Sequence, residues 1–207
     1  MIHLRSLLTC IAVLAIAMPT TAMAGTLTLS IVPVSQNVVR GGSGYVVDFT
    51  LTTTDSVGLS GFNISLKTDP LAGVSFTGGD ASVTNYVFAG NSIGLLFNTP
   101  DGANTADIND SPDNPPVTIV GPGIYGLGEI FFSIAGNAPL GIINVTLDSS
   151  TSFTDRNGSP ITFVPDTNTT IGTVTVVPEP SSLVMGAIGI ATGLVSLAKR
   201  QRSYDKT

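Results

Sequence analysis

The feature of this chain that most limits its fold lies between residues 25 and 177, where short runs of β-branched and alternating residues repeat. Glycine, asparagine, aspartate and proline separate these runs, and none has the period of an amphipathic helix. The predicted strands are 26–34, 45–53, 61–67, 74–76, 85–88, 92–98, 126–135, 142–149, 161–164 and 171–177. Many short strands without helices pack as two sheets, so we predict an all-β fold: a single jelly-roll or Greek-key β-sandwich of about nine strands.

Local patterns add detail to this prediction. In the run 45–53, Tyr45, Val47, Phe49 and Leu51 alternate with polar residues and are assigned to the core face. Glycine-rich turns are predicted at 40–44 and 77–80, a turn start at Asp69-Pro70, and a hairpin at 155–158. The stretch 99–123, rich in aspartate, asparagine and proline, is predicted to be irregular and is excluded as a central strand.

Charge and residue inventory exclude several functions. Between residues 25 and 177 there are three basic and twelve acidic residues, a formal charge of −9, which repels phosphate backbones and excludes nucleic acid as a partner. The single cysteine, Cys10, and the single histidine, His3, lie near the N-terminus. A mature protein without that segment has no disulfide, no cysteine nucleophile and no imidazole for acid-base catalysis.

The segment 1–24 has the organisation of a secretory signal peptide. Basic residues come first, an apolar run follows at 7–18, and the segment ends Thr-Ala-Met-Ala. This pattern predicts cleavage by signal peptidase between Ala24 and Gly25. A buried helix of the fold is the alternative interpretation.

The region 178–207 has the organisation of a second targeting segment. It begins Pro178-Glu179-Pro180, continues as an apolar stretch, and reaches a basic cluster at 199–202. We predict a transmembrane helix at about 181–198, because the stretch is just long enough to cross about 30 Å of hydrocarbon. The basic cluster should remain cytoplasmic, with the domain 25–177 across the membrane. A permanent single-pass anchor is one interpretation of this region.

A Pro-Glu-Pro motif, one apolar helix and a terminal basic cluster, on a chain with a signal peptide, resemble the PEP-CTERM sorting signal of Gram-negative bacteria. The residues that match are Pro178, Glu179, Pro180, Lys199, Arg200 and Arg202. The resemblance implies processing by an exosortase, a membrane transpeptidase-like enzyme that cleaves near Pro-Glu-Pro. It also implies transient anchoring in the inner membrane and delivery to the cell surface or extracellular matrix.

The order of segments in the middle of the chain resembles cohesin domains. The matching segments are 27–34, 45–51, 59–70, 128–134, 138–141 and 155–158. The resemblance implies a nine-stranded jelly-roll sandwich related to carbohydrate-binding modules. One sheet face of cellulosomal cohesins binds the calcium-loaded dockerin, so a protein or polysaccharide ligand at a sheet face is expected.

One polar cluster suggests a metal site. Carboxylate and amide oxygens at close spacing are the ligands that calcium prefers. The candidate calcium ligands are Asp107, Asn109, Asp110 and Asp113. A solvated loop is the alternative, and no other cofactor is predicted.

These observations favour a non-enzymatic, exported surface or matrix protein with a binding, adhesion or structural domain. The alternatives are a secreted carbohydrate-active enzyme and a single-pass, membrane-anchored carbohydrate-binding protein. An enzyme would need a carboxylate pair, such as Glu129 with Asp48 or Asp148, but Glu129 is predicted to start a strand and lie at an edge or surface. The tyrosines at 45, 86 and 125 are interpreted as core or rim residues. Self-association through exposed sheet edges is a third hypothesis.

Overall fold

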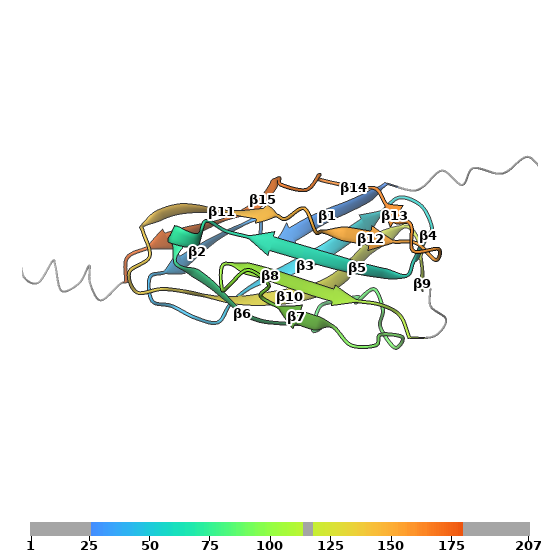
Figure 1. The fold of residues 1–207 in the computed structure, drawn as a ribbon, viewed down its shortest axis with the longest axis horizontal. Coiled ribbons are helices and arrows are strands. Elements are labelled where there is room, and N and C mark those ends of the chain that lie inside the picture. Colours follow the sequence, from blue (N-terminus) through green and yellow to red (C-terminus); the bar gives the residue numbers. More distant parts are fainter. Residues whose placement is uncertain (1–25, 114–117, 180–207) are drawn as a thin grey trace, which may run out of the picture.

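Two β-sheets pack face to face in the computed structural model, which describes residues 26–113 and 118–179 (Figure 1). The predicted signal peptide, its cleavage site at Ala24 and Gly25, and the predicted sorting tail from Pro180 onward lie outside these residues. Within the described ranges, no helix is both long and apolar enough to span a membrane.

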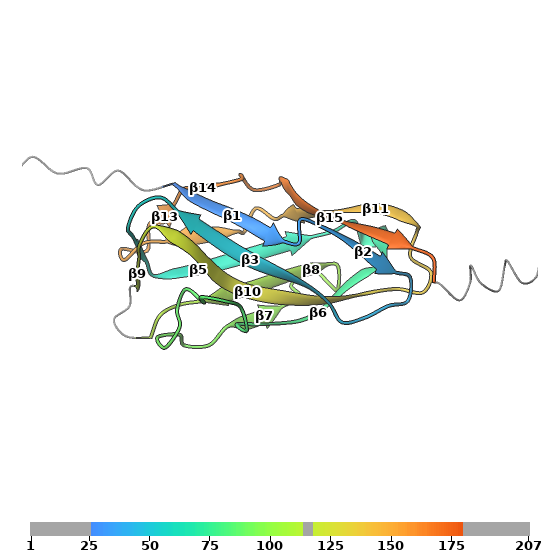
Figure 2. The ribbon, with the colours of Figure 1, turned by 180° about the vertical axis from the view of Figure 1, so that it is seen from behind.

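Sheet A has five strands in the order β14-β1-β3-β10-β6 (Figure 2). All neighbours are antiparallel except β14 and β1, which run parallel. Its strands are β1 Leu27–Val32, β3 Tyr45–Thr53, β6 Val74–Asp80, β10 Gly123–Ile134 and β14 Phe163–Val164.

Sheet B has eight strands and faces the viewer in Figure 1. Its main path is β13-β12-β5-β11-β15-β2, and β8 pairs with the other edge of β5 and with β7. Its strands are β2 Ser35–Val39, β5 Gly61–Lys67, β7 Leu96–Asn98, β8 Thr105–Asp110, β11 Gly141–Leu147, β12 Ser152–Thr154, β13 Pro160–Ile161 and β15 Thr170–Val177. A separate ribbon pairs β4 Val57–Leu59 with β9 Thr118–Val120.

One hydrophobic core fills the space between the sheets. Val47, Phe49 and Leu51 of β3 are buried, as predicted from their alternation, and Tyr45 packs against the core while half-buried. The predicted all-β sandwich is therefore confirmed. The predicted hairpin at 155–158 is also confirmed, because it joins β12 to β13 and its Gly158 amide donates to the Asp155 carbonyl.

Several predicted strand limits are wrong. The run 26–34 ends as β1 at Val32, after which the chain crosses to sheet B as β2, because Pro33 has no amide hydrogen to continue the ladder. The predicted turn at 77–80 is the second half of β6, which pairs with β10. The predicted strand 85–88 is a set of turns, with Asn85 at φ 53° and a single bridge from Tyr86 to Gly126.

The largest error concerns 99–123. The sequence predicts no central strand here, yet the stretch contains β8, which is hydrogen-bonded to β5 on one side and β7 on the other. Ala106, Ile108 and Asp110 are buried, whereas the residues between them are half-exposed. The alternation was hidden because two of the three outward residues are the turn-favouring types aspartate and asparagine.

Candidate binding surface

The outer side of sheet B presents a broad polar surface, which we call the sheet B face. It is formed by side chains at alternate positions of three strands that point away from the core. These residues are Asn63 and Lys67 of β5, with Ser65 covered between them at 3% exposure, Thr105, Asp107 and Asn109 of β8, and Ile142, Asn144 and Thr146 of β11. In the pairing register Lys67 lies opposite both Thr105 and Thr146, so the three strands form one continuous surface.

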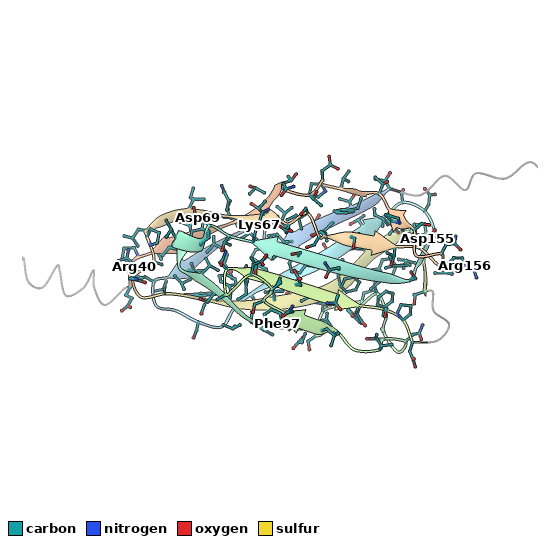
Figure 3. All side chains as sticks on the ribbon, viewed as in Figure 1. Arg40, Lys67, Asp69, Phe97, Asp155 and Arg156 are labelled. Atoms are coloured by element: carbon teal, nitrogen blue, oxygen red, sulfur yellow. The ribbon has the colours of Figure 1, made fainter. Side chains whose placement is uncertain are left out.

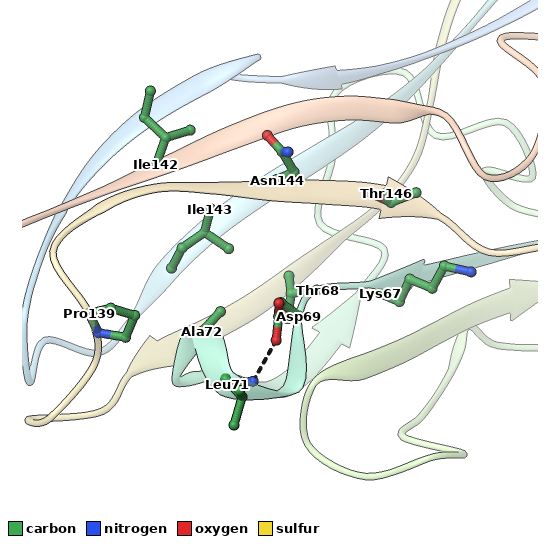
Figure 4. Close-up of a pocket in the computed structure, with 10 residues that line it drawn as sticks. All are labelled: Lys67, Thr68, Asp69, Leu71, Ala72, Pro139, Ile142, Ile143, Asn144 and Thr146. Carbon is green, nitrogen blue, oxygen red and sulfur yellow. Dashed lines mark hydrogen bonds between the residues drawn. The ribbon is translucent and has the colours of Figure 1, made fainter.

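A first hollow of about 520 Å³ opens on this face where β5 ends and β11 begins (Figure 4). Its most exposed aliphatic side chains are Leu71, at 85% exposure, and Ile142, at 73%. The hollow is lined by Lys67, Thr68, Asp69, Leu71, Ala72, Pro139, Ile142, Ile143, Asn144 and Thr146.

A short 3₁₀ turn, η1 (Pro70–Ala72), holds Leu71 outward. Asp69 caps this turn, because its Oδ1 accepts a hydrogen bond of 2.8 Å from the Leu71 amide. Gly73 ends the turn at φ 69°, a left-handed conformation that glycine adopts without strain. The predicted turn start at Asp69-Pro70 is therefore confirmed, and its consequence is an exposed leucine at the rim of the hollow.

Lys67 supplies the positive charge of the first hollow, but that charge is already engaged. Its Nζ donates to Asp148 Oδ2 at 2.8 Å and to Asn168 Oδ1 at 2.9 Å. The hydrogen bond from Lys67 is the main reason that the pKa of Asp148 lies below its ordinary value.

A second hollow of about 310 Å³ opens at the other end of β5, beside β8 and β12. It too has exposed aliphatic side chains, Ile93 at 62% and Leu96 at 60% exposure. The remainder of its lining is mostly hydroxyl, amide and glycine: Ser60, Gly61, Phe62, Asn63, Gly94, Asn109, Asp110, Ser111, Ser152 and Thr154.

Asp110 fixes the chain beside this second hollow. Its side chain is 4% exposed and accepts hydrogen bonds from the hydroxyls of Tyr86 and Ser92 and from the Ser111 amide. Burial, together with the hydrogen bond to Asp110, raises the pKa of Tyr86 above its ordinary range. The Asp110 side chain therefore ties the segment 81–95, between β6 and β7, to the end of β8. We call these hydrogen bonds the Asp110 clamp.

The four candidate calcium ligands do not form one ligand set in the structure. Asp107 and Asn109 point outward from β8, whereas Asp110 points to the interior and is used by the clamp. Asp113 lies beyond the strand and is exposed. In residues 26–113 and 118–179, no three acidic, histidine or cysteine side chains are grouped closely enough to hold a metal ion.

The structure brings one of the two candidate carboxylate pairs together, Glu129 with Asp48, and separates the other, Glu129 with Asp148. Glu129 is not at the start or edge of a strand: it lies within β10, opposite Asp48 of β3 and Asp80 of β6, on the outer side of sheet A. Asp148 is across the molecule beside Lys67 of sheet B. Partial burial, then the hydrogen bond with Asp80, raises the pKa of Glu129 to about 7.

The three tyrosines lie within the described ranges, whereas the residues of the predicted sorting motif do so only in part. Tyr45, Tyr86 and Tyr125 are half-buried against the core, which confirms the core or rim interpretation. Pro178 and Glu179 directly follow β15, and Glu179 is exposed. The other sorting residues, Pro180, Lys199, Arg200 and Arg202, lie outside the described part of the chain.

Sequence reasoning missed the aliphatic rims of both hollows. One signal was available: the adjacent residues Ile142 and Ile143 lie on a strand, so one of them must face outward. The same signal is present at the adjacent residues Leu95 and Leu96 within the predicted strand 92–98. Nothing comparable marks Leu71 or Ile93, whose exposure depends on how the connections fold.

Comparison with known proteins identifies the fold. No protein-family model and no curated protein matches the chain. The seventh ScaB type I cohesin from Pseudobacteroides cellulosolvens matches with a TM-score of 0.55 at 15% identity, over 74% of this chain and 94% of the cohesin. The cohesin CaCohA2 from Clostridium acetobutylicum matches with a TM-score of 0.56 at 18% identity, over 73% and 91%. The third cohesin of ScaC from Acetivibrio cellulolyticus, solved in complex with the ScaB dockerin, matches with a TM-score of 0.55 at 20% identity, over 73% and 99%. The domain is thus a cohesin-like β-sandwich.

Proposed function

We propose that this chain is a non-enzymatic, exported surface or matrix protein that binds a protein partner through the sheet B face. The observation that carries the proposal is the pair of hollows at the two ends of β5, each rimmed by exposed aliphatic side chains. Exposed apolar groups gathered within a polar surround are typical of interaction sites.

The chemistry of the face supports a macromolecular ligand. Ile142 and Leu71 offer apolar area for burial, while Asn63, Asn109 and Asn144 offer both donors and acceptors between and beside them. The face is continuous across β8, β5 and β11, which suits a partner that spans several strands. Several cohesins of similar fold were solved with dockerin proteins, which favours protein over polysaccharide.

Site-specific photocrosslinking in the native host tests the proposal. A benzophenone amino acid replaces Ile142 on the sheet B face or Leu96 of β7, at the rim of the second hollow. The matched control replaces Ile124, an isoleucine on the outer side of sheet A that is 63% exposed. We expect one defined protein adduct from both sheet B positions and none from the control.

The outcomes separate the alternatives. Adducts that carry glycan without protein would identify a carbohydrate ligand instead. Adducts with another copy of this chain would support the structural, self-associating alternative. Equal adducts from Ile124 and Ile142, or no adduct from either sheet B position, would contradict binding through this face.

We further propose that both ends of the chain are targeting signals. Signal peptidase removes 1–24. An exosortase cleaves near Pro178-Glu179-Pro180, after transient anchoring by the predicted helix at about 181–198. Pro178 follows β15 without a spacer, so cleavage there would leave the sandwich complete. Intact-mass analysis of the protein from the host tests both steps. We expect a chain from Gly25 to near Pro178, whereas a chain extending to Thr207 would establish a permanent anchor.

A further inference from the structure

One cluster beside the first hollow brings together three side chains that can react with one another. Lys67 Nζ lies 2.8 Å from Asp148 Oδ2 and 2.9 Å from Asn168 Oδ1. The three residues come from the end of β5, the connection after β11 and the turn before β15. Lys67 is the only lysine in the described part of the chain, and it lies away from Arg40 and Arg156, which are near the two ends of the molecule (Figure 3). The one lysine amine of this part of the chain is therefore held against a side-chain amide.

The backbone of Asn168 fixes where that amide lies. Asn168 has a left-handed conformation, φ 62°, which asparagine adopts more readily than most residues, and its backbone amide donates to the Leu147 carbonyl at 2.8 Å. Across the strands, Lys67 lies opposite Thr146 of β11, and Thr146 lies opposite Thr170, the first residue of β15. The Lys67 side chain therefore reaches across β11, and a bond from it to Asn168 would join β5 to the start of β15.

Asp148 is oriented as a base toward the amine. Its Oδ1 accepts hydrogen bonds from the Ser149 hydroxyl and the Ser150 backbone amide, both at 3.2 Å, while its Oδ2 contacts Lys67. A positioned carboxylate can take a proton from an amine and return it to a leaving group. The terminal torsion of an asparagine side chain is broad, so a small rotation presents Cγ of Asn168 to Nζ. Groups held in this way react as if present at an effective molarity of about 10⁵–10⁸ M.

We propose that Lys67 and Asn168 form an intramolecular isopeptide bond, with Asp148 transferring the protons. The starting form is the ion pair of Lys67 and Asp148, from which Asp148 takes one ammonium proton. The neutral Nζ attacks Cγ of Asn168. The bond between Nζ and Cγ forms, the bond between Cγ and Nδ2 breaks, and the two protons lost by Nζ leave with Nδ2 as ammonium. The reaction needs no oxidant, reductant or other co-reactant.

The exposure of the cluster favours completion of the reaction. The side chains of Lys67 and Asp148 are 38% and 31% exposed, so the released ammonium escapes to solvent and the bond is not reversed. The product is a covalent link across β11 that holds β5 and β15 together independently of the backbone ladders. This inference does not depend on the proposed binding partner.

Mass spectrometry of the purified full chain tests the inference without any partner or variant. We expect a mass lower than that of the sequence by one ammonia. Trypsin cleaves after lysine and arginine, and acylation of Lys67 blocks cleavage there. The fragment 41–156 should therefore remain joined to the fragment that begins at Asn157, with the link located at Lys67 and Asn168. A protein of full mass that trypsin cleaves after Lys67 into separate fragments would overturn the inference.

Variants assign the roles of the individual groups. Asn168→Ala removes the carbon that is attacked and should have its full mass, whereas Asn144→Ala, at another exposed asparagine of sheet B, should still lose ammonia. Asp148→Asn should slow bond formation by about 100-fold or more, measured as the rise of the lighter species with time after synthesis. Asp166→Asn, at an exposed carboxylate near Asn168, should not slow it. Ammonia loss that persists in Asn168→Ala, or equal rates in the two aspartate variants, would contradict the assignment.

Discussion

Glu129 is placed where its proton matters to stability. It lies between Asp48 and Asp80 on the outer side of sheet A, and its pKa in the folded chain is about 7 against an ordinary value of 4.5. The folded state therefore binds more protons than the unfolded state between these values. Glu129 therefore lowers the free energy of unfolding as the pH rises from about 4.5 to 7.

Glu129→Gln should remove that loss. We expect the variant to have a higher Tm than the unmodified chain at pH 8 and a similar Tm at pH 4, measured by circular dichroism. Asp166→Asn, which changes an exposed carboxylate in the connection between β14 and β15, should not change the pH dependence. An unchanged slope in Glu129→Gln would show that Glu129 and Asp80 do not share a proton.

Gly172 of β15 illustrates a second constraint at the level of one residue. A Cβ there would lie 2.0 Å from Ile31 Cδ1 and 3.1 Å from the Val34 carbonyl oxygen. Gly172→Ala should destabilise the fold by about 1–3 kcal/mol, because the packed core must shift to admit the methyl group. Gly136→Ala is the control, since its Cβ would meet nothing within 4 Å. Chemical denaturation of the two variants should separate them clearly.

Among the elements, β8 gives the most direct test of the architecture. Its amides and carbonyls pair with β5 on one side and β7 on the other. We expect the amides of Thr105–Asp110 that pair with β5 to be protected from hydrogen exchange to a degree similar to β5 itself. The exposed connection 100–103, where the amides of Asp101 and Gly102 donate only to bonds within the same turn, serves as the faster-exchanging reference. Exchange of β8 as fast as that connection would contradict an interior strand.

The contrast between β3 and β8 explains what could be predicted from the sequence. In β3 the outward positions contain aspartate and threonine between large apolar residues, so the alternation is plain. In β8 the inward set is Ala106, Ile108 and Asp110, which is too weakly apolar to outweigh its turn-favouring neighbours. The predicted fold class is correct despite this error, because the other strands still define two sheets.

The binding face could not be predicted in the same way. It depends on β5 meeting β8 and β11, which are separated from it along the chain and pair only in the folded sheet. The sequence marks Asp107 for its oxygen atoms, but only the folded sheet sets its neighbours across the strands, Ser65 and Asn98. Asp110, assigned to the same cluster, turns to the interior because successive strand residues face opposite sides.

The Asp110 clamp fixes the segment between β6 and β7 through the hydroxyls of Tyr86 and Ser92. Asp110→Ala leaves the hydroxyls of Tyr86 and Ser92 without their acceptor, so we expect a loss of about 1–3 kcal/mol in the free energy of unfolding. Asp113→Ala, at an exposed carboxylate nearby, should change it by less than about 0.5 kcal/mol. Equal effects of the two changes in urea titrations would contradict the clamp.

At the scale of the whole molecule, the two sheets share one hydrophobic core. Neither sheet buries its inner side without the other, so we expect a single cooperative unfolding transition. Leu51→Ala in sheet A and Ile64→Ala in sheet B are both at fully buried positions and should each cost about 2–5 kcal/mol. Far-ultraviolet circular dichroism and tyrosine fluorescence should report the same midpoint for each variant. Separate midpoints would indicate that the sheets unfold independently.

The described chain enters and leaves the sandwich at opposite ends: β1 starts at one end and β15 finishes at the other (Figures 1 and 2). The strands run along this long axis, and β15 lies between β11 and β2. Tension applied at Pro178 and resisted at the far end would therefore act along β15 and load its ladders to both neighbours in shear. Because bonds loaded in shear must yield together, whereas bonds that are peeled yield in succession, both ladders of β15 would resist such tension at once.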